Sequence, residues 1–212
     1  MNDLTEIAER IHHSFEDRTA ARDQILAQAR TLTRHCANAI RAIHRNENEL
    51  AQENLVQAES IVKGFRGVRQ DYPELYFVGY TQDVLKEYAE ASIVCALIMG
   101  LELPSPEDLG VEFATYLQGL AEAVGELRRR CLDDLLHERP EEAIRLLEHM
   151  DDIYAILVSM DYPDAITGGL RRLTDLARSI IERTRGDLTL SLRQEKLEQS
   201  LQRLEEKLDN HG

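Results

Sequence analysis

The stretch LKEYAEAS, residues 85–92, sets two glutamates three positions apart among leucine, tyrosine and alanine. On an α-helix, residues three or four positions apart share a face, so Glu87 and Glu90 would lie side by side. Like charges at this spacing destabilise an isolated helix. The neighbouring apolar residues favour burial, and they continue into Val94 and Leu97 on the same stripe. The stretch therefore predicts a helix with a half-buried acidic face, whose repulsion something must compensate.

A second acidic pair follows in LAEAVGELRRR, residues 120–130, where Glu122 and Glu126 stand four positions apart. An apolar stripe lies beside them, formed by Leu120, Val124, Leu127 and Cys131. Gly119 and Gly125 are small enough to let another helix approach. Two successive predicted helices thus each carry a glutamate pair.

Carboxylates that lose water in a cluster must bind protons, cations or a metal ion, because an uncompensated buried charge is costly. Four oxygen donors suit Mg²⁺ or Mn²⁺, which activate water and neutralise a phosphoryl oxygen in hydrolysis. The ordinary alternative is that Glu126 pairs with Arg129 or Arg130, and Glu90 with Lys86. Spacing alone leaves open whether the two pairs meet.

Helical periodicity extends over the rest of the chain, and no alternating strand pattern competes with it. All five prolines stand where this periodicity breaks, at positions 73, 104, 106, 140 and 163. We expect an all-α protein with one domain over residues 1–212. Its seven predicted helices lie at 3–46, 48–70, 74–101, 107–137, 140–160, 164–185 and 189–209. A break of the first helix near Glu16 is an alternative. Asp187 or Thr189 would cap the last helix after Gly186.

Composition limits the class of protein. The chain has 212 residues, 43% of them hydrophobic, and a formal net charge of −14. Its three cysteines, Cys36, Cys95 and Cys131, are far apart and have no CxxC spacing, which favours a reducing compartment. No run approaches the roughly 20 apolar residues that a membrane span needs. We expect a cytoplasmic protein without a membrane partner.

The negative charge is unevenly distributed. Between Arg18 and Arg45 the chain carries six arginines and one acid, so this segment is +5. On a helix, four of these arginines form one stripe, at Arg30, Arg34, Arg41 and Arg45. The stripe is either a solvated face that pairs with acidic neighbours or a surface that follows a phosphate backbone.

The acidic segments resemble the translin family. YTQDVLKEYAEAS (80–92), followed by YLQGLAEAVGELRRR (116–130), is similar to its catalytic branch, which includes translin-associated factor X and the archaeal translin-like proteins. RDQILAQARTLTRHCANAIRAIHR (22–45) resembles the first long helix of the family, and DLARSIIERTRGDLT (175–189) its last helices. The resemblance covers most of the chain and keeps the order of the two acidic motifs.

The resemblance implies a seven-helix bundle that assembles into a hollow, barrel-like homo-oligomer, an octamer. Inside it, an endoribonuclease that depends on Mg²⁺ (or Mn²⁺) cuts single-stranded RNA, and single-stranded DNA is a further candidate ligand. Carried over to this chain, the catalytic and metal-binding acids are Glu87, Glu90, Glu122 and Glu126. Glu122 departs from the aspartate that is frequent in the catalytic branch and reaches one methylene further.

The RNA backbone would be held by the arginine stripe and by two arginines next to the second acidic motif, Arg128 and Arg129. The alternative function is a non-catalytic scaffold of the same fold that binds single-stranded RNA or DNA. Most of the four acids are missing from the non-catalytic branch of the family, so their presence favours the nuclease. A ferritin-like di-metal oxidase is a weaker rival, because it calls for two E-x-x-H motifs. The chain offers Glu9 with His12, and Asp134 with His137 as a poorer match.

Overall fold

The described residues, 3–209 of the computed structural model, form helices and no strand, which confirms the all-α prediction. Six helices are long: α1 (Leu4–His44), α2 (Asn48–Asp71), α4 (Gly79–Met99), α6 (Phe113–Leu136), α7 (Pro140–Ser159) and α9 (Leu170–Asp209). Three are single turns: α3 (Pro73–Tyr76), α5 (Pro106–Leu109) and α8 (Asp164–Thr167). Among the described residues, no helix combines the length and the apolar composition that crossing a bilayer would require.

The chain divides into two compact units, residues 1–119 and 120–212. Helix α6 contributes to both, because it begins in the first unit and ends in the second. Each unit is described by itself. That residues 1–212 form one domain stays a prediction.

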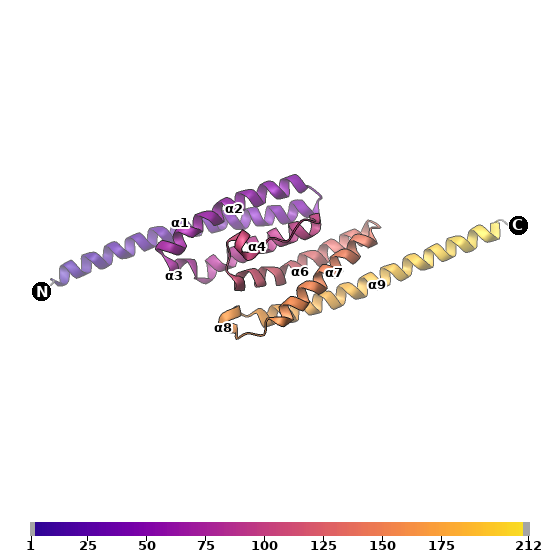
Figure 1. Ribbon diagram of the computed structural model, residues 1–212. Helices are drawn as coiled ribbons and strands as arrows, with labels where there is room; N and C mark the ends of the chain where they lie inside the picture. The colour runs from indigo at the N-terminus through magenta and orange to yellow at the C-terminus, as the bar shows by residue number, and fades with distance from the viewer. Residues whose placement is uncertain (1–2, 210–212) are drawn as a thin grey trace. The chain divides into compact units, whose positions relative to one another are not determined.

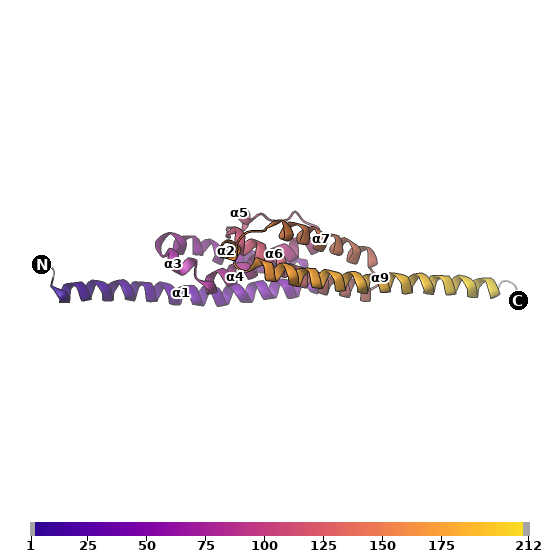
Figure 2. The same cartoon turned by 90° about the horizontal axis from the view of Figure 1, so that it is seen from below.

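In the first unit, α1 packs along both α2 and α4, and these two also touch each other (Figure 1). The core consists of apolar side chains from the three helices, among them Leu32, Ile43, Phe65, Leu85 and Ile93. The N-terminal part of α1 extends beyond α2 and α3 in both Figures 1 and 2. It exposes Leu4, Ile11 and Phe15 along one side.

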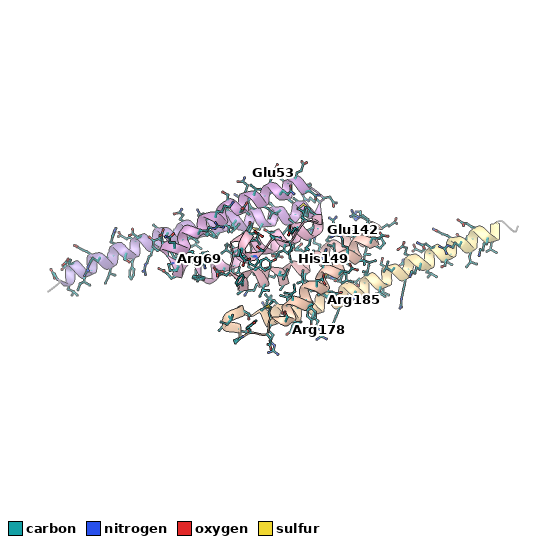
Figure 3. The ribbon with its side chains drawn as sticks, in the orientation of Figure 1. Glu53, Arg69, Glu142, His149, Arg178 and Arg185 are labelled. Atoms are coloured by element: carbon teal, nitrogen blue, oxygen red, sulfur yellow. The ribbon has the colours of Figure 1, made fainter. Side chains whose placement is uncertain are left out.

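In the second unit, α7 packs on α9, and α8 adds a turn beside them. Leu146 and Met150 of α7 and Ile181 of α9 are buried there. Arg185, labelled in Figure 3, bridges from α9 to Asp151 of α7 at 2.6 Å. Beyond residue 190, α9 exposes a series of leucines, Leu197, Leu201, Leu204 and Leu208.

Proline and glycine mark the ends of several helices as the sequence predicts. Pro73, Pro106 and Pro140 each occupy the first turn of a helix, where the missing N–H costs nothing. Helix α4 ends at Gly100, whose φ of 67° is the left-handed conformation that glycine adopts without strain.

The predicted helix bounds are wrong in three places. The predicted helices 74–101 and 107–137 are each interrupted, after Tyr76 and after Leu109. At the C-terminus, residues 164–185 and 189–209 do not form separate helices. Helix α9 runs unbroken through Gly186, and the Thr189 hydroxyl donates back to the Arg185 carbonyl at 2.7 Å instead of capping a new helix. Asp187 forms an ion pair with Arg128 at 2.8 Å, and Leu188 is buried. These tertiary contacts offset the roughly 1 kcal/mol that a glycine costs within a helix. Helix α1 is also continuous past Glu16.

Candidate functional site

Glu87 and Glu90 lie on α4 and are half-buried, as predicted. Between and beside them, Tyr88 and Ala89 are buried. Both carboxylates lie near Cys36 of α1, which is 2% exposed. Burial raises the pKa of the Cys36 thiol to about 12, and the negative charges of Glu87 and Glu90 contribute to the rise. The glutamate pair therefore borders the α1–α4 contact.

The start of α6 is fixed on α4 in the same unit. A Cβ added to Gly119 would lie 2.9 Å from the Ala89 Cβ, 2.9 Å from the Lys86 carbonyl oxygen and 3.0 Å from the Glu90 nitrogen. A hydrogen bond from the Thr115 hydroxyl to Gln82 Oε1, 2.6 Å long, fixes the register. Gly119 thus permits close helix approach, as predicted. Among the described residues, no atom outside the helix itself would lie within 4 Å of a Cβ at Gly125, so the same prediction is not confirmed there.

Glu122 and Glu126 follow Gly119 by three and seven positions on α6, and at 3.6 residues per turn they share its side of the helix. Both are half-buried. Arg129 Nη1 lies 3.7 Å from Glu126 Oε2, so the alternative pairing predicted for Glu126 is present as a long ion pair. An exposed pair of this kind contributes only about 0–1 kcal/mol.

Each glutamate pair is thus defined within its own unit, Glu87 with Glu90 in the first and Glu122 with Glu126 in the second. Within residues 3–209, no group of three or more His, Cys, Asp or Glu side chains is arranged to hold a metal ion. Two carboxylates one turn apart, half-buried beside an apolar core, do fit half of a site for a hard divalent cation. The convergence of all four acids stays a prediction.

The arginine stripe of α1 lies on the solvent side. Arg30, Arg34, Arg41 and Arg45 are exposed, and none forms an ion pair with an acid among the described residues. Their hydrogen bonds are local, from Arg30 to the Leu26 carbonyl and from Arg41 to Asn38. The reading of this stripe as a face neutralised by acidic neighbours is therefore wrong within the described residues.

The same stripe points away from the first glutamate pair. With 3.6 residues per turn, Arg34 and Cys36 stand about 200° apart around α1. Cys36 belongs to the buried face next to Glu87 and Glu90, whereas Arg34 belongs to the exposed face. One chain therefore presents its arginine stripe and its α4 acids on opposite sides of α1.

Comparison with solved structures identifies the fold and the family. The structure of AfC3PO in complex with duplex RNA shares 35% sequence identity with this chain, covering 87% of it and 95% of AfC3PO, with a TM-score of 0.81. AfC3PO is translin-like. The chain belongs to the translin family.

Two further proteins are similar to this chain. The translin-family chain is 30% identical over 191 residues to an uncharacterised protein of Methanocaldococcus jannaschii, covering 89% of this chain and 84% of the relative. Apo-NeC3PO, at 20% identity and a TM-score of 0.78, shares the fold. No family model matches the chain. The resemblance stated for the two acidic segments is thus confirmed at the level of the family.

The two remaining arginine candidates of this translin-family protein have intramolecular partners. Arg128 is bonded within the second unit, to Asp187 at 2.8 Å and to the Thr184 hydroxyl at 3.1 Å, and its side chain is 26% exposed. Arg129 is exposed and pairs with Glu126. Arg128 thus ties α6 to α9, a role that its position beside the acidic motif does not indicate. The sequence feature that indicates this role is the acidic partner Asp187, which was predicted to cap a helix instead.

The rival set of metal ligands is not arranged as an oxidase requires. Asp134 is 1% exposed and is held by two arginines, Arg130 Nε at 3.1 Å and Arg139 Nη2 at 2.8 Å. Its neighbour His137 contacts the Asp133 carbonyl at 2.7 Å. Glu9 and His12 are both exposed on the extended part of α1. Asp134 therefore ties α6 to the turn before α7.

Proposed function

We propose that this protein is a metal-dependent endoribonuclease that hydrolyses RNA through the acids of α4 and α6. The observation that carries the proposal is the close packing of Gly119 on α4, where an added Cβ would lie 3.0 Å from the Glu90 nitrogen. Gly119 precedes Glu122 and Glu126 on the same helix, and the family resemblance assigns these two acids to one site with Glu87 and Glu90. Four carboxylates in one site would repel one another without a cation.

In this proposal, Glu87, Glu90, Glu122 and Glu126 hold Mg²⁺ or Mn²⁺. A bound ion of this kind lowers the pKa of water and neutralises charge on a phosphoryl oxygen. Glu87 and Glu90 are partly desolvated and lie next to the buried thiol of Cys36. Glu122 and Glu126 also have further interactions that compete with an ion, of which the contact with Arg129 is the one described above.

RNA binding is the second part of the proposal. The related AfC3PO has been solved with duplex RNA, and the unpaired arginines of α1 in this chain form a stripe suited to phosphates. The resemblance of the acidic segments to the family implies single-stranded RNA as the substrate. The substrate test therefore includes both a single strand and a duplex, with single-stranded DNA as a third ligand.

Assembly into a hollow homo-octamer is the third part. The unpartnered ends of α1 and α9 expose Leu4, Ile11, Phe15 and the leucines from 197 to 208. Apolar stripes on projecting helices favour contacts with further chains, since their burial is favourable by roughly 25 cal/mol per Å². Light scattering at micromolar concentration should give the mass of eight chains, and a monomer mass would contradict the assembly.

The deciding experiment incubates labelled single-stranded RNA, duplex RNA and single-stranded DNA with the purified protein in Mg²⁺, Mn²⁺ or chelator. Cleavage of RNA that requires the metal supports the nuclease. Binding of RNA without cleavage in any metal supports the alternative, a scaffold of the same fold. Cleavage that persists in chelator contradicts the role of the four acids.

A further inference from the structure

A cavity of about 470 Å³ lies in the first unit, away from the arginine stripe of α1. It is bordered by α2, Tyr76 of α3 and the segment from Pro106 to Phe113. Its volume is within the roughly 300–1,000 Å³ that is usual for small-molecule sites. Val62, Leu85 and Val111 form an apolar wall, and two arginines and two glutamates are the charged groups.

One of the two arginines is fixed and neutralised. Arg69, labelled in Figure 3, has its Nη1 3.0 Å from Glu112 Oε1. Its guanidinium also lies over two aromatic rings, 5.5 Å from the centroid of Tyr76 and 5.8 Å from that of Phe77. Arg69 and Glu112 together therefore make a rigid, electrically balanced side of the cavity.

The other arginine is not held by an ion pair within the described part of the chain. Arg66, one turn earlier on α2, forms no hydrogen bond or ion pair with any described residue. Its Nη2 would lie 3.3 Å from a Cβ at Gly110, so the guanidinium lies close to the Gly110 backbone. Gly110 also has a φ of +67°, which strains any other residue. The loop thus places an unneutralised guanidinium at an apolar cavity, which suits an anionic ligand.

The other groups narrow the class of anion. Phe113 lines the cavity and is 68% exposed, so its ring offers a face on which a planar base can stack. Glu107 also lines the cavity, and a carboxylate can accept hydrogen bonds from ribose hydroxyls or from a base amine. A small inorganic anion would use Arg66 alone and make no use of Phe113 or Glu107. A neutral apolar ligand would leave Arg66 unpaired.

We propose that this cavity binds a nucleoside monophosphate, with the phosphate on Arg66 and the base against Phe113. The nucleotide is either free or the terminal residue of an RNA strand, since both present the same groups. The site does not require nuclease activity and uses neither the four acids nor the arginine stripe. An experiment can therefore show that the nucleotide does not bind here without contradicting the proposed nuclease, and the reverse also holds.

The test titrates AMP, GMP, CMP and UMP into the full-length protein by calorimetry, with adenosine and inorganic phosphate as partial ligands. At least one nucleotide should bind at least ~10-fold more tightly than either partial ligand, because only a nucleotide contacts both Arg66 and Phe113. Arg66→Gln and Phe113→Ala should each weaken nucleotide binding by ~10-fold or more. Both side chains are exposed, so circular dichroism should show an unchanged fold.

Two variants serve as matched controls. Lys63→Gln removes a cation one turn before Arg66 that pairs with Glu59 at 2.6 Å and lies outside the cavity. Arg34→Gln alters the arginine stripe of α1. Neither should change nucleotide affinity. A loss in Arg34→Gln equal to that in Arg66→Gln would overturn the proposal, since the nucleotide would then be held by general positive charge.

A trinucleotide with a 5′-phosphate, a 3′-phosphate or neither distinguishes the two sources of the ligand. Tighter binding of a phosphorylated strand than of free nucleotide assigns the site to an RNA end, and the reverse assigns it to a free nucleotide. The proposal is overturned if no nucleotide or phosphorylated trinucleotide binds saturably in the millimolar range. It is also overturned if Arg66→Gln leaves their affinity unchanged.

Discussion

Gly119 of α6 lies so close to Ala89 of α4 that a methyl group at position 119 would approach the Ala89 Cβ to 2.9 Å. The Lys86 carbonyl oxygen and the Glu90 nitrogen are equally near, and neither backbone atom can move aside as a side chain can. The separation of α4 and α6 is therefore set by the absence of a side chain at residue 119.

Gly119→Ala should consequently push α6 away from α4. We expect a loss of about 1–3 kcal/mol in the free energy of unfolding, the usual cost of overpacking, together with reduced metal-dependent cleavage. Urea unfolding and a cleavage assay on the same preparation measure both. Gly186→Ala is the control: open space surrounds that position in α9, so it should gain ~0.5–1 kcal/mol from helix propensity. Equal responses of the two variants would contradict the tight contact.

Glu126→Gln separates a metal ligand from a salt bridge. A lost ligand should reduce cleavage by orders of magnitude while RNA binding persists. Metal-free stability should stay level or rise, because repulsion from Glu122 worth roughly 0.2–0.5 kcal/mol is relieved. Arg129→Gln is the matched control, since it breaks the 3.7 Å pair and keeps the acid. Full activity of Glu126→Gln with lowered metal-free stability would remove this residue from the site.

The arginine stripe predicts the dependence of RNA affinity on salt. Replacing Arg34 and Arg41 by glutamine should lower the slope of log K against log salt by about 1.4 for a single strand. The cleavage rate at saturating RNA should change little, because these side chains lie opposite the face of α1 that borders Glu87 and Glu90. Arg22→Gln is the control, as Asp23 already pairs with that arginine at 3.1 Å. An unchanged slope would exclude the stripe from the binding surface.

The buried thiols predict loss of stability in alkali. Burial raises the pKa of Cys36, Cys95 and Cys131 from 9.0 to about 12. The folded state thus favours the neutral thiol, and its contribution to stability is complete below pH 9 and falls as the pH rises toward 12. Each thiol contributes up to ~1.4 kcal/mol per pH unit in this window.

Urea unfolding at several pH values between 8 and 11 should show this decline, and Cys36→Ala should make it shallower. The conservative replacement at a buried site will lower stability at every pH, so the slope and not the absolute value is compared. Stability that stays flat between pH 8 and pH 11 would contradict the burial of the thiols.

Local patterns in the sequence were sufficient for the all-α class and for the half-buried state of Glu87 and Glu90. The continuous α9 was not predicted, because the pairing of Asp187 with Arg128 and the burial of Leu188 are tertiary contacts that outweigh Gly186. Arg128 was predicted to bind RNA because its real partners are distant in the sequence. Thr184, for example, is 56 residues away along the chain, so local patterns do not reveal the contact. Gly119 and Gly125 look alike in sequence, but among the described residues only Gly119 has another helix against it.

The opposite placement of Arg34 and Cys36 around α1 has an evolutionary consequence under the proposed function. Substitutions that change RNA affinity fall on the exposed side of α1, whereas those that change the cleavage rate fall on α4 and α6. The two groups of positions are separate, so RNA affinity and cleavage can each change or be lost independently. A descendant that lost its acids would still hold RNA, and duplication of the gene would let one copy specialise in binding while the other kept the chemistry.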